Sequence, residues 1–165
     1  MDKILVAYFS ATGTTARVAH ALAEAAGADL YAITPAEPYS AADLNWHDKK
    51  SRSSLEMADA ASRPAIAGAL PDVAPYGVIF VGFPIWWYQA PRIIETFVQG
   101  LDLAGKTLVP FATSGGSPLG ESGAILAKLA PGSRWLAGRR LNAGASAAEL
   151  AAWLKELGLR AGEGR

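Results

Sequence analysis

Short runs of consecutive apolar residues alternate along this chain with longer segments in which apolar positions recur at helical spacing. Six apolar residues in a row, from Ile4 to Phe9, fit a strand that is buried on both faces, and the dozen residues after them favour a helix. The same alternation continues along the chain. The pattern predicts strands at residues 3–9, 29–33, 77–83, 107–113 and 135–141. It predicts helices at residues 14–26 and 91–98, near 119–129, and from a cap at Ser146 to Gly158.

Strands that alternate with helices pair in parallel through right-handed crossovers. The predicted fold class is therefore α/β, with a doubly wound five-stranded parallel sheet in a three-layer sandwich. Pro110 is the one residue that fits this sheet badly, because it has no N–H group to donate to a neighbouring strand. We expect a strand end or a bulge at Pro110.

The connection from residue 34 to residue 76 is longer than a plain crossover and holds five of the ten prolines. We expect it to carry structure of its own, with a helix at 53–61 and a candidate flap at 39–52. With 165 residues, the chain is expected to form one domain over residues 1–160, followed by a frayed tail at 161–165.

The amino-acid composition excludes several classes of molecule as binding partners and several kinds of chemical site. Fifteen basic and fifteen acidic residues cancel, which argues against binding to nucleic acids or anionic membranes, since both need a basic excess. No cysteine is present, which excludes disulfides, thiolate metal sites and cysteine nucleophiles and is compatible with a reducing cytoplasm. The first residues lack a signal-peptide pattern, and the longest apolar stretch, 78–88, is far shorter than the ~20 residues of a membrane helix. We expect a cytoplasmic protein that does not enter membranes.

A hydroxyl-rich loop joins the first predicted strand to the first predicted helix. Such a loop aims backbone N–H groups and the positive end of a helix at one point, and its hydroxyls supply further donors. This pattern predicts a phosphate-binding loop; the alternative is a helix cap made of small polar residues. The candidate phosphate-binding residues are Ser10, Thr12, Gly13, Thr14 and Thr15.

Two further loops follow strands that should be neighbours of the first, at the edge where open α/β sheets bind ligands. Large aromatic side chains in the second loop suit stacking on a planar ligand, although one of the two tryptophans could instead pack in the core. Two glycines in the third loop would allow backbone groups to approach a ligand edge. The candidate residues are Pro84, Ile85, Trp86, Trp87 and Tyr88 in the second loop, and Thr113, Ser114, Gly115 and Gly116 in the third.

Other patterns carry less weight. Residues 100–107 satisfy the nucleotide-binding pattern G-x-x-x-x-G-K-T, but they follow a predicted helix and open a strand, so no helix N-terminus would face a phosphate. We interpret them as a helix-to-strand turn. The two histidines have no ligand-like neighbours, so no metal site or catalytic triad is predicted; a ligand contact stays open for His47, which adjoins Trp46.

Taken together, the three loops resemble those of flavodoxins and flavodoxin-like FMN proteins. Residues 10–15 match the family's [ST]-x-T-G-x-T phosphate pattern, and the chain looks most like a short bacterial subgroup with a Pro-Ile-Trp-Trp loop. The resemblance implies a strand order of 2-1-3-4-5. It also implies FMN as cofactor, with its phosphate on the first loop and its ring system between the second and third loops.

The resemblance implies a redox function but leaves its type open. Electron-carrier flavodoxins are typically strongly acidic, whereas the net charge here is zero. The expected function is that of an FMN-binding electron carrier for a redox partner protein. The alternatives are an FMN-dependent NAD(P)H oxidoreductase that acts on quinones or similar small planar acceptors, and a relic of the fold that binds no flavin. Either a monomer or a homodimer is compatible with the sequence.

Overall fold

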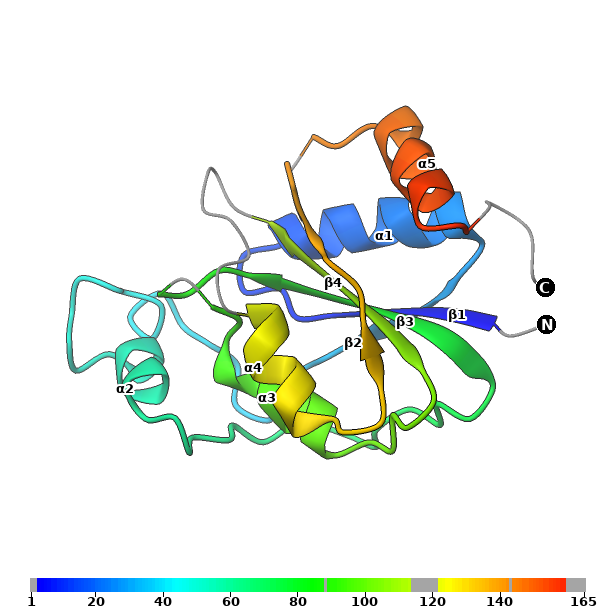
Figure 1. The fold of residues 1–165 in the computed structure, drawn as a ribbon. Coiled ribbons are helices and arrows are strands. Elements are labelled where there is room, and N and C mark those ends of the chain that lie inside the picture. Colours follow the sequence, from blue (N-terminus) through cyan, green and yellow to red (C-terminus); the bar gives the residue numbers. More distant parts are fainter. Residues whose placement is uncertain (1–2, 88, 114–121, 143, 160–165) are drawn as a thin grey trace.

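The computed structural model describes residues 3–87, 89–113, 122–142 and 144–159. A parallel sheet with the strand order β2-β1-β3-β4-β5 forms its centre, and β6 also pairs with β4 (Figure 1). The predicted α/β fold class and strand order are confirmed. The strands are β1 (Lys3–Tyr8), β2 (Asp29–Ala32), β3 (Tyr76–Pro84), β4 (Thr107–Thr113), β5 (Arg134–Trp135) and β6 (Arg139–Leu141). The helices are α1 (Thr14–Ala26), α2 (Arg52–Ala58), α3 (Arg92–Gln99), α4 (Ser122–Leu129) and α5 (Ala147–Glu156).

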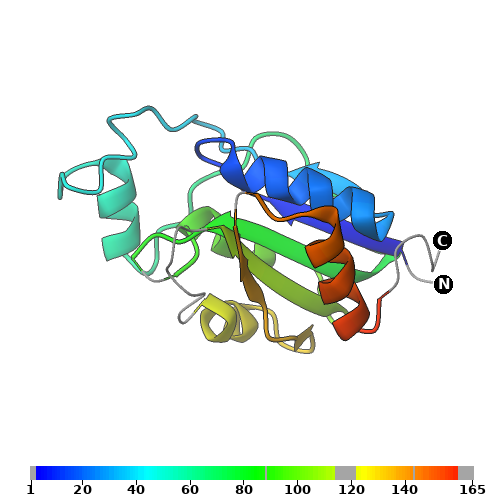
Figure 2. The same ribbon diagram turned by 90° about the horizontal axis from the view of Figure 1, so that it is seen from above.

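Helices cover both faces of the sheet, as the apolar runs predict. Helices α1 and α5 lie on one face, and α3 and α4 lie on the other (Figures 1 and 2). Alternate residues of β1 serve the two layers: Val6 packs with the α1–α5 side, and Leu5 and Ala7 pack with the α3 side. No helix in the described parts of the chain is long and apolar enough to cross a membrane.

The three central strands end at the same edge of the sheet. Tyr8 at the end of β1 pairs with Gly82 in β3, and Gly82 pairs with Phe111 in β4. The segments that follow β1, β3 and β4 therefore emerge side by side. Figure 1 shows that α2 and the part of the long connection around it lie at this edge as well.

Pro110 lies within β4, so the expected strand end or bulge at this residue is wrong; the interruption is in the neighbouring strand instead. The Leu136 N–H donates to the Leu108 carbonyl at 2.9 Å, and Pro110 lies two residues further along β4, so its nitrogen faces the same neighbour. Pro110 offers that neighbour no N–H. The strand predicted at 135–141 is accordingly split into β5 and β6.

The long connection is closed at its base. Ala36 N–H donates to the Ala65 carbonyl at 2.9 Å, and Ala67 N–H donates to the Thr34 carbonyl at 2.7 Å. Helix α2 is the helix expected in this connection, but it starts one residue earlier and ends three residues earlier than the predicted 53–61. The helix predicted near 119–129 is found as α4, which is described from Ser122 onward. Residues 119–121 and the tail at 161–165 lie outside the described part of the chain.

Gly82 allows β3 and β4 to pack at this edge. A Cβ atom at Gly82 would lie 2.1 Å from Cζ of Phe111, whose side chain is fully buried. We predict that Gly82→Ala lowers the free energy of unfolding by about 1–3 kcal/mol, because the ring must leave its rotamer or the strands must separate. Urea denaturation measures the change.

Gly123→Ala is the matched control. Nothing lies within 4 Å of a Cβ atom at Gly123, and this residue lies in α4, where alanine favours the helix. The control should therefore be neutral or stabilising. Equal unfolding midpoints for Gly82→Ala and the unmodified protein would show that the contact with Phe111 does not constrain the sheet.

Candidate ligand site at the carboxyl edge of the sheet

The loop between β1 and α1 is ordered but leaves its donors open. Gly13 adopts a left-handed conformation with φ 94°, and its N–H donates to Ser10 Oγ at 3.0 Å. No side chain caps α1 at Gly13, and its first turn contains no acidic residue. The backbone N–H groups at the start of the helix therefore remain available beside the exposed Thr12. This arrangement suits an anion.

Thr15 has a second connection within the site. Its hydroxyl lies 2.6 Å from that of Thr113 at the end of β4, and both residues are buried, Thr15 being 1% exposed. This hydrogen bond joins the first turn of α1 to the start of the third loop. Thr14 is only half-buried. The hydroxyl of Thr15 is thus used inside the protein, whereas the side chain of Thr14 stays partly exposed at this edge of the sheet.

The second candidate loop, which contains Trp86 and Trp87 and is called the aromatic loop below, forms a tight turn. Trp86 and Gln89 exchange two backbone hydrogen bonds of 2.9 and 3.2 Å, and Trp87 between them has an unusual positive φ of 51°. Trp86 packs edge-to-face on Phe9, with ring centroids 5.8 Å apart, and lies against the core. Trp87 is 42% exposed. The question left open by the sequence is thus answered for these two residues: Trp86 packs inward and Trp87 is available.

Of the other predicted site residues in the second and third loops, some lie in the described part of the chain and some lie outside it. Pro84 ends β3, and Pro84 and Ile85 are half-buried below the aromatic turn. Four predicted site residues, Tyr88, Ser114, Gly115 and Gly116, lie outside the described residues. The structure thus brings the first loop and the aromatic loop to one edge, together with Thr113 from the third.

Tyr39 fastens the long connection to this edge. Its ring contacts Phe9 and Trp86 edge-to-face, with centroid distances of 5.7 and 5.4 Å. Its hydroxyl donates to Glu56 Oε1 at 2.5 Å, and the Arg52 guanidinium lies 3.9 Å from the ring centroid. Burial and the hydrogen bond to the Glu56 carboxylate raise the pKa of Tyr39 well above its usual range. Arg52 and Glu56, one turn apart in α2, form an ion pair at 3.0 Å.

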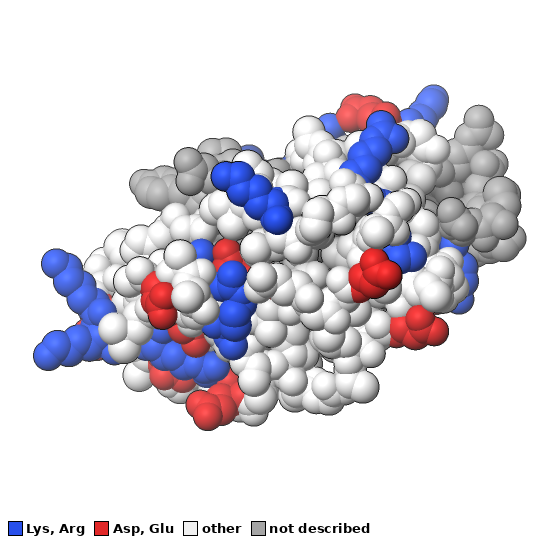
Figure 3. Space-filling model, turned by 60° about the horizontal axis from the view of Figure 1, so that its bottom comes forward, with Lys and Arg blue, Asp and Glu red and all other residues white. Residues whose placement is uncertain are grey.

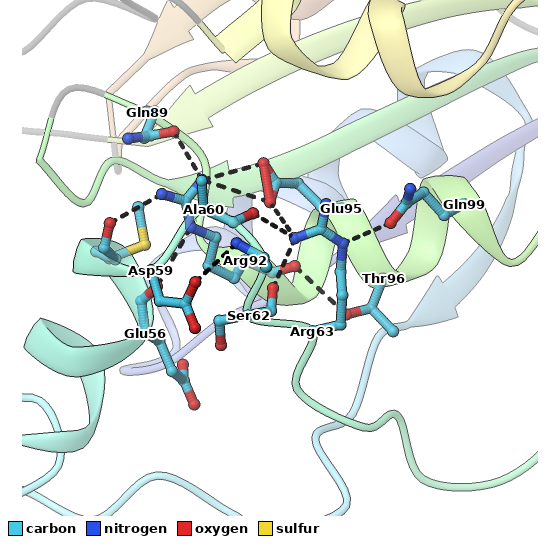
Figure 4. Close-up of polar contacts among 12 residues, drawn as sticks. Glu56, Asp59, Ala60, Ser62, Arg63, Gln89, Arg92, Glu95, Thr96 and Gln99 are labelled. Atoms are coloured by element: carbon cyan, nitrogen blue, oxygen red, sulfur yellow. Dashed lines mark hydrogen bonds and ion pairs between the residues drawn. The ribbon is translucent and has the colours of Figure 1, made fainter.

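A buried guanidinium joins α2 to the aromatic loop (Figure 4). Arg92, which is 6% exposed, donates to the carbonyls of Glu56 and Met57 at 3.3 and 2.8 Å and to Gln89 Oε1 at 3.2 Å. Its charge is balanced by Glu95, 3.1 Å away and 3% exposed. Arg92 thereby caps two carbonyls of the last turn of α2.

Glu95 also accepts a second guanidinium. Arg63, on the segment that returns from α2, donates to Glu95 Oε2 at 3.0 Å and to Gln99 Oε1 at 2.5 Å. One buried carboxylate thereby holds the C-terminal end of α2, through Arg92, and the segment that follows it, through Arg63, against α3. Sequence reasoning missed this cluster: the Arg92–Glu95 spacing suggests a pair on one helix, but nothing local identifies Arg63 as its partner.

A cavity of about 610 Å³ opens between the long connection and the aromatic loop. His47, whose role the sequence left open, contributes to its wall. The lining residues are Trp46, His47, Lys49, Ser54, Met57, Ala58 and Trp87.

The misleading nucleotide-binding pattern at 100–107 is a helix-to-strand turn, as predicted. It begins at Gly100, which ends α3, and runs into β4. The ammonium group of Lys106 donates to the Tyr76 carbonyl at 2.7 Å.

The Arg92 cluster yields a stability prediction. Arg92→Met should lower the free energy of unfolding by about 2–4 kcal/mol, because the buried Glu95 carboxylate keeps only the Arg63 guanidinium and the Glu56 and Met57 carbonyls lose a donor. Lys3→Met is the control: it breaks the exposed Lys3–Asp29 pair and should cost less than about 1 kcal/mol. Urea unfolding of both variants tests this, and equal losses would contradict a central role for Arg92.

The raised pKa of Tyr39 gives a pH prediction. As the pH rises above about 10, an unfolded chain loses the Tyr39 proton while the folded protein keeps it, so this residue makes the free energy of unfolding fall with rising pH. In the folded state at about pH 10.5, the unmodified protein and Tyr39→Phe should show the same tyrosinate absorbance. In denaturant, the unmodified protein should show more. A difference between the two folded proteins would mean that Tyr39 ionises normally.

Comparison with known proteins identifies the family. The family model described as Flavodoxin matches residues 3–157. A putative flavoprotein from Bacteroides eggerthii is 52% identical, with a TM-score of 0.91 over 97% of this chain and 100% of that chain. Another, from Bacteroides uniformis, is 55% identical, with a TM-score of 0.89 over 93% and 98%.

More distant structures share the fold. The flavoprotein from Lactobacillus acidophilus, solved in complex with FMN, is 21% identical, with a TM-score of 0.69 over 85% of this chain and 93% of that chain. No curated protein matches the chain. The match to the family model over nearly the whole length and the two relatives at above 50% identity show that this chain belongs to the flavodoxin family.

Proposed function

We propose that this protein binds FMN at the carboxyl edge of its sheet and transfers electrons through it. The observation that carries the proposal is the uncapped start of α1 behind Thr12 and Gly13, at the same edge as the exposed ring of Trp87. The first feature suits a phosphate and the second suits a planar ring. A relative of the same fold binds FMN, which supports the choice of flavin.

The residues fit the cofactor by their chemistry. The first loop would hold the phosphate through the hydroxyls of Ser10 and Thr12 and the backbone N–H groups of Thr14 and Thr15, while Gly13 turns the backbone and donates its own N–H to Ser10 Oγ. The second loop, Pro84–Tyr88, would flank the ring system, chiefly with Trp87, while Trp86 supports the turn from below. Thr113, Ser114, Gly115 and Gly116 would meet the polar edge of the ring. Bound FMN supplies one-electron and two-electron redox chemistry.

The protein's own contribution is to position and desolvate this group. The helix dipole of α1 favours a dianionic phosphate, and no acidic side chain in its first turn opposes it. The buried hydrogen bond between Thr15 and Thr113 fixes the first loop relative to the third. The Trp86–Gln89 turn, held from below by Phe9 and Tyr39, presents Trp87 at a fixed place.

Two roles follow for such a flavoprotein. As an electron carrier, it would pass electrons between a reductase and a redox partner protein. As an FMN-dependent NAD(P)H oxidoreductase, it would reduce a quinone or a similar planar acceptor. The cavity beside Trp87 favours this second role, because it offers room for a small molecule. The zero net charge also gives little long-range attraction for a charged protein partner.

Two measurements test these roles. Titration of the purified protein into FMN should quench flavin fluorescence, and absence of quenching would overturn the proposal. The loaded protein is then mixed with NADH or NADPH and a quinone, without an added reductase. Rapid turnover assigns the oxidoreductase role, and its absence assigns the carrier role.

The phosphate loop yields a specific prediction. Thr12→Ala removes one hydroxyl donor and should raise the FMN dissociation constant about tenfold or more, the size expected for a hydrogen bond to a charged group. Gly13→Val should weaken FMN binding as well, because φ 94° strains any side chain although the space around Gly13 is open.

Gly105→Val is the matched control for Gly13→Val. Gly105 also has a positive φ, 78°, with nothing within 4 Å of a Cβ atom, but it lies in the turn before β4. The control should carry a similar backbone strain and bind FMN normally. An unchanged FMN dissociation constant in both Thr12→Ala and Gly13→Val would refute the assignment of the first loop.

A further inference from the structure

Trp46 is unusually exposed for a large aromatic side chain. It lies in the long connection and is 64% exposed, so its ring forgoes most of the free energy that burial would give. One face of the indole stacks on the imidazole of His47, with ring centroids 3.7 Å apart and an angle of 30° between the planes. The outer face of this stacked pair forms a platform that the core does not use.

Short-range hydrogen bonds hold this platform in place. His47 N–H donates to Asn45 Oδ1 at 3.1 Å, and Asp48 N–H donates to the Asn45 carbonyl at 3.1 Å. The segment is then tied to α2, because the Ser54 hydroxyl donates to the Asp48 carbonyl at 2.7 Å. The platform is therefore ordered before any ligand arrives, which lowers the entropic cost of binding.

The platform forms part of the wall of the 610 Å³ cavity, and the aromatic loop contributes Trp87. Met57 and Ala58 of α2 add apolar surface to the same wall. A volume of several hundred cubic ångströms is typical of pockets for small organic ligands, and walls with two indole rings suit a planar aromatic one.

The charge of the lining is one-sided. Lys49 contributes an ammonium group, and the described lining residues include no acidic side chain. The nearby Asp48 carboxylate does not line the cavity; it accepts the N–H of Lys50 at 2.9 Å. At the end of the molecule that carries α2, Figure 3 shows both basic and acidic side chains at the surface, so the preference for charge comes from Lys49 in the lining. A ligand with a negatively charged group is therefore favoured over a cation.

We propose that this cavity binds a small planar aromatic molecule that carries an acidic group, stacked on the Trp46–His47 platform with its anionic group toward Lys49. The cavity is distinct from the phosphate and ring-edge contacts of FMN, because its lining includes no residue of the first loop or of β4. Among the described lining residues, Trp87 is the one that it shares with the proposed flavin site. Its use as the site of a redox substrate rests on the proposed oxidoreductase role, whereas the binding itself does not.

The test uses anthraquinone-2-sulfonate, with the uncharged 2-(hydroxymethyl)anthraquinone as a comparison, and calorimetric titration of the protein with and without FMN. Trp46→Ala should weaken both probes about tenfold, as expected for the loss of one stacking ring. Lys49→Gln should weaken only the sulfonate, by about two- to fivefold, as expected for an exposed charge. Lys50→Gln is the matched control, since Lys50 does not line the cavity, and it should change neither affinity.

The proposal is overturned if the unmodified protein binds neither probe in either form, or if Trp46→Ala binds both as tightly as the unmodified protein does. If Trp46→Ala does not fold, the Lys49→Gln and Lys50→Gln pair decides, and equal sulfonate affinity in the two overturns the proposal. A parallel FMN titration separates the two claims. Binding of the probe without FMN binding supports the cavity and refutes the flavin proposal; FMN binding without probe binding does the reverse.

Discussion

The buried carboxylate of Glu95 and the guanidinium of Arg92 hold together the aromatic side of the candidate site, where α2, α3 and the aromatic loop meet. A charge pair that is almost fully buried persists only when its remaining donors and acceptors are satisfied. Here these groups come from the end of α2, the aromatic loop and, through Arg63, the returning connection. The pair therefore couples the order of the long connection to the position of the aromatic turn.

The first loop depends on a different constraint. It lies between a strand buried on both faces and the first turn of α1, so its position is set by the central sheet. Thr15 and Thr113 extend that control to the third loop. The sheet thus fixes the position of the end of the site where the FMN phosphate is expected. The cluster of Arg63, Arg92 and Glu95 fixes the position of the aromatic loop and of the cavity beside it.

The sequence predicted the parts that depend on local pattern. Consecutive apolar runs gave the central strands, and the hydroxyl-rich turn gave the first loop, because these signals arise within a few residues. It could not predict contacts between distant segments. The partnership of Arg63 with Glu95, the inward packing of Trp86 under Tyr39 and the split of the last strand opposite Pro110 all depend on which segments become neighbours. Periodicity carries no such information.

The most direct test of the central claim compares the affinities of FMN and riboflavin, which share the ring system and differ in the phosphate. If the open start of α1 and the hydroxyls of Ser10 and Thr12 hold that phosphate, FMN should bind at least about a hundredfold more tightly, since several charge-assisted hydrogen bonds depend on it. Equal dissociation constants for the two flavins would contradict the account, because the first loop would then contribute nothing to binding.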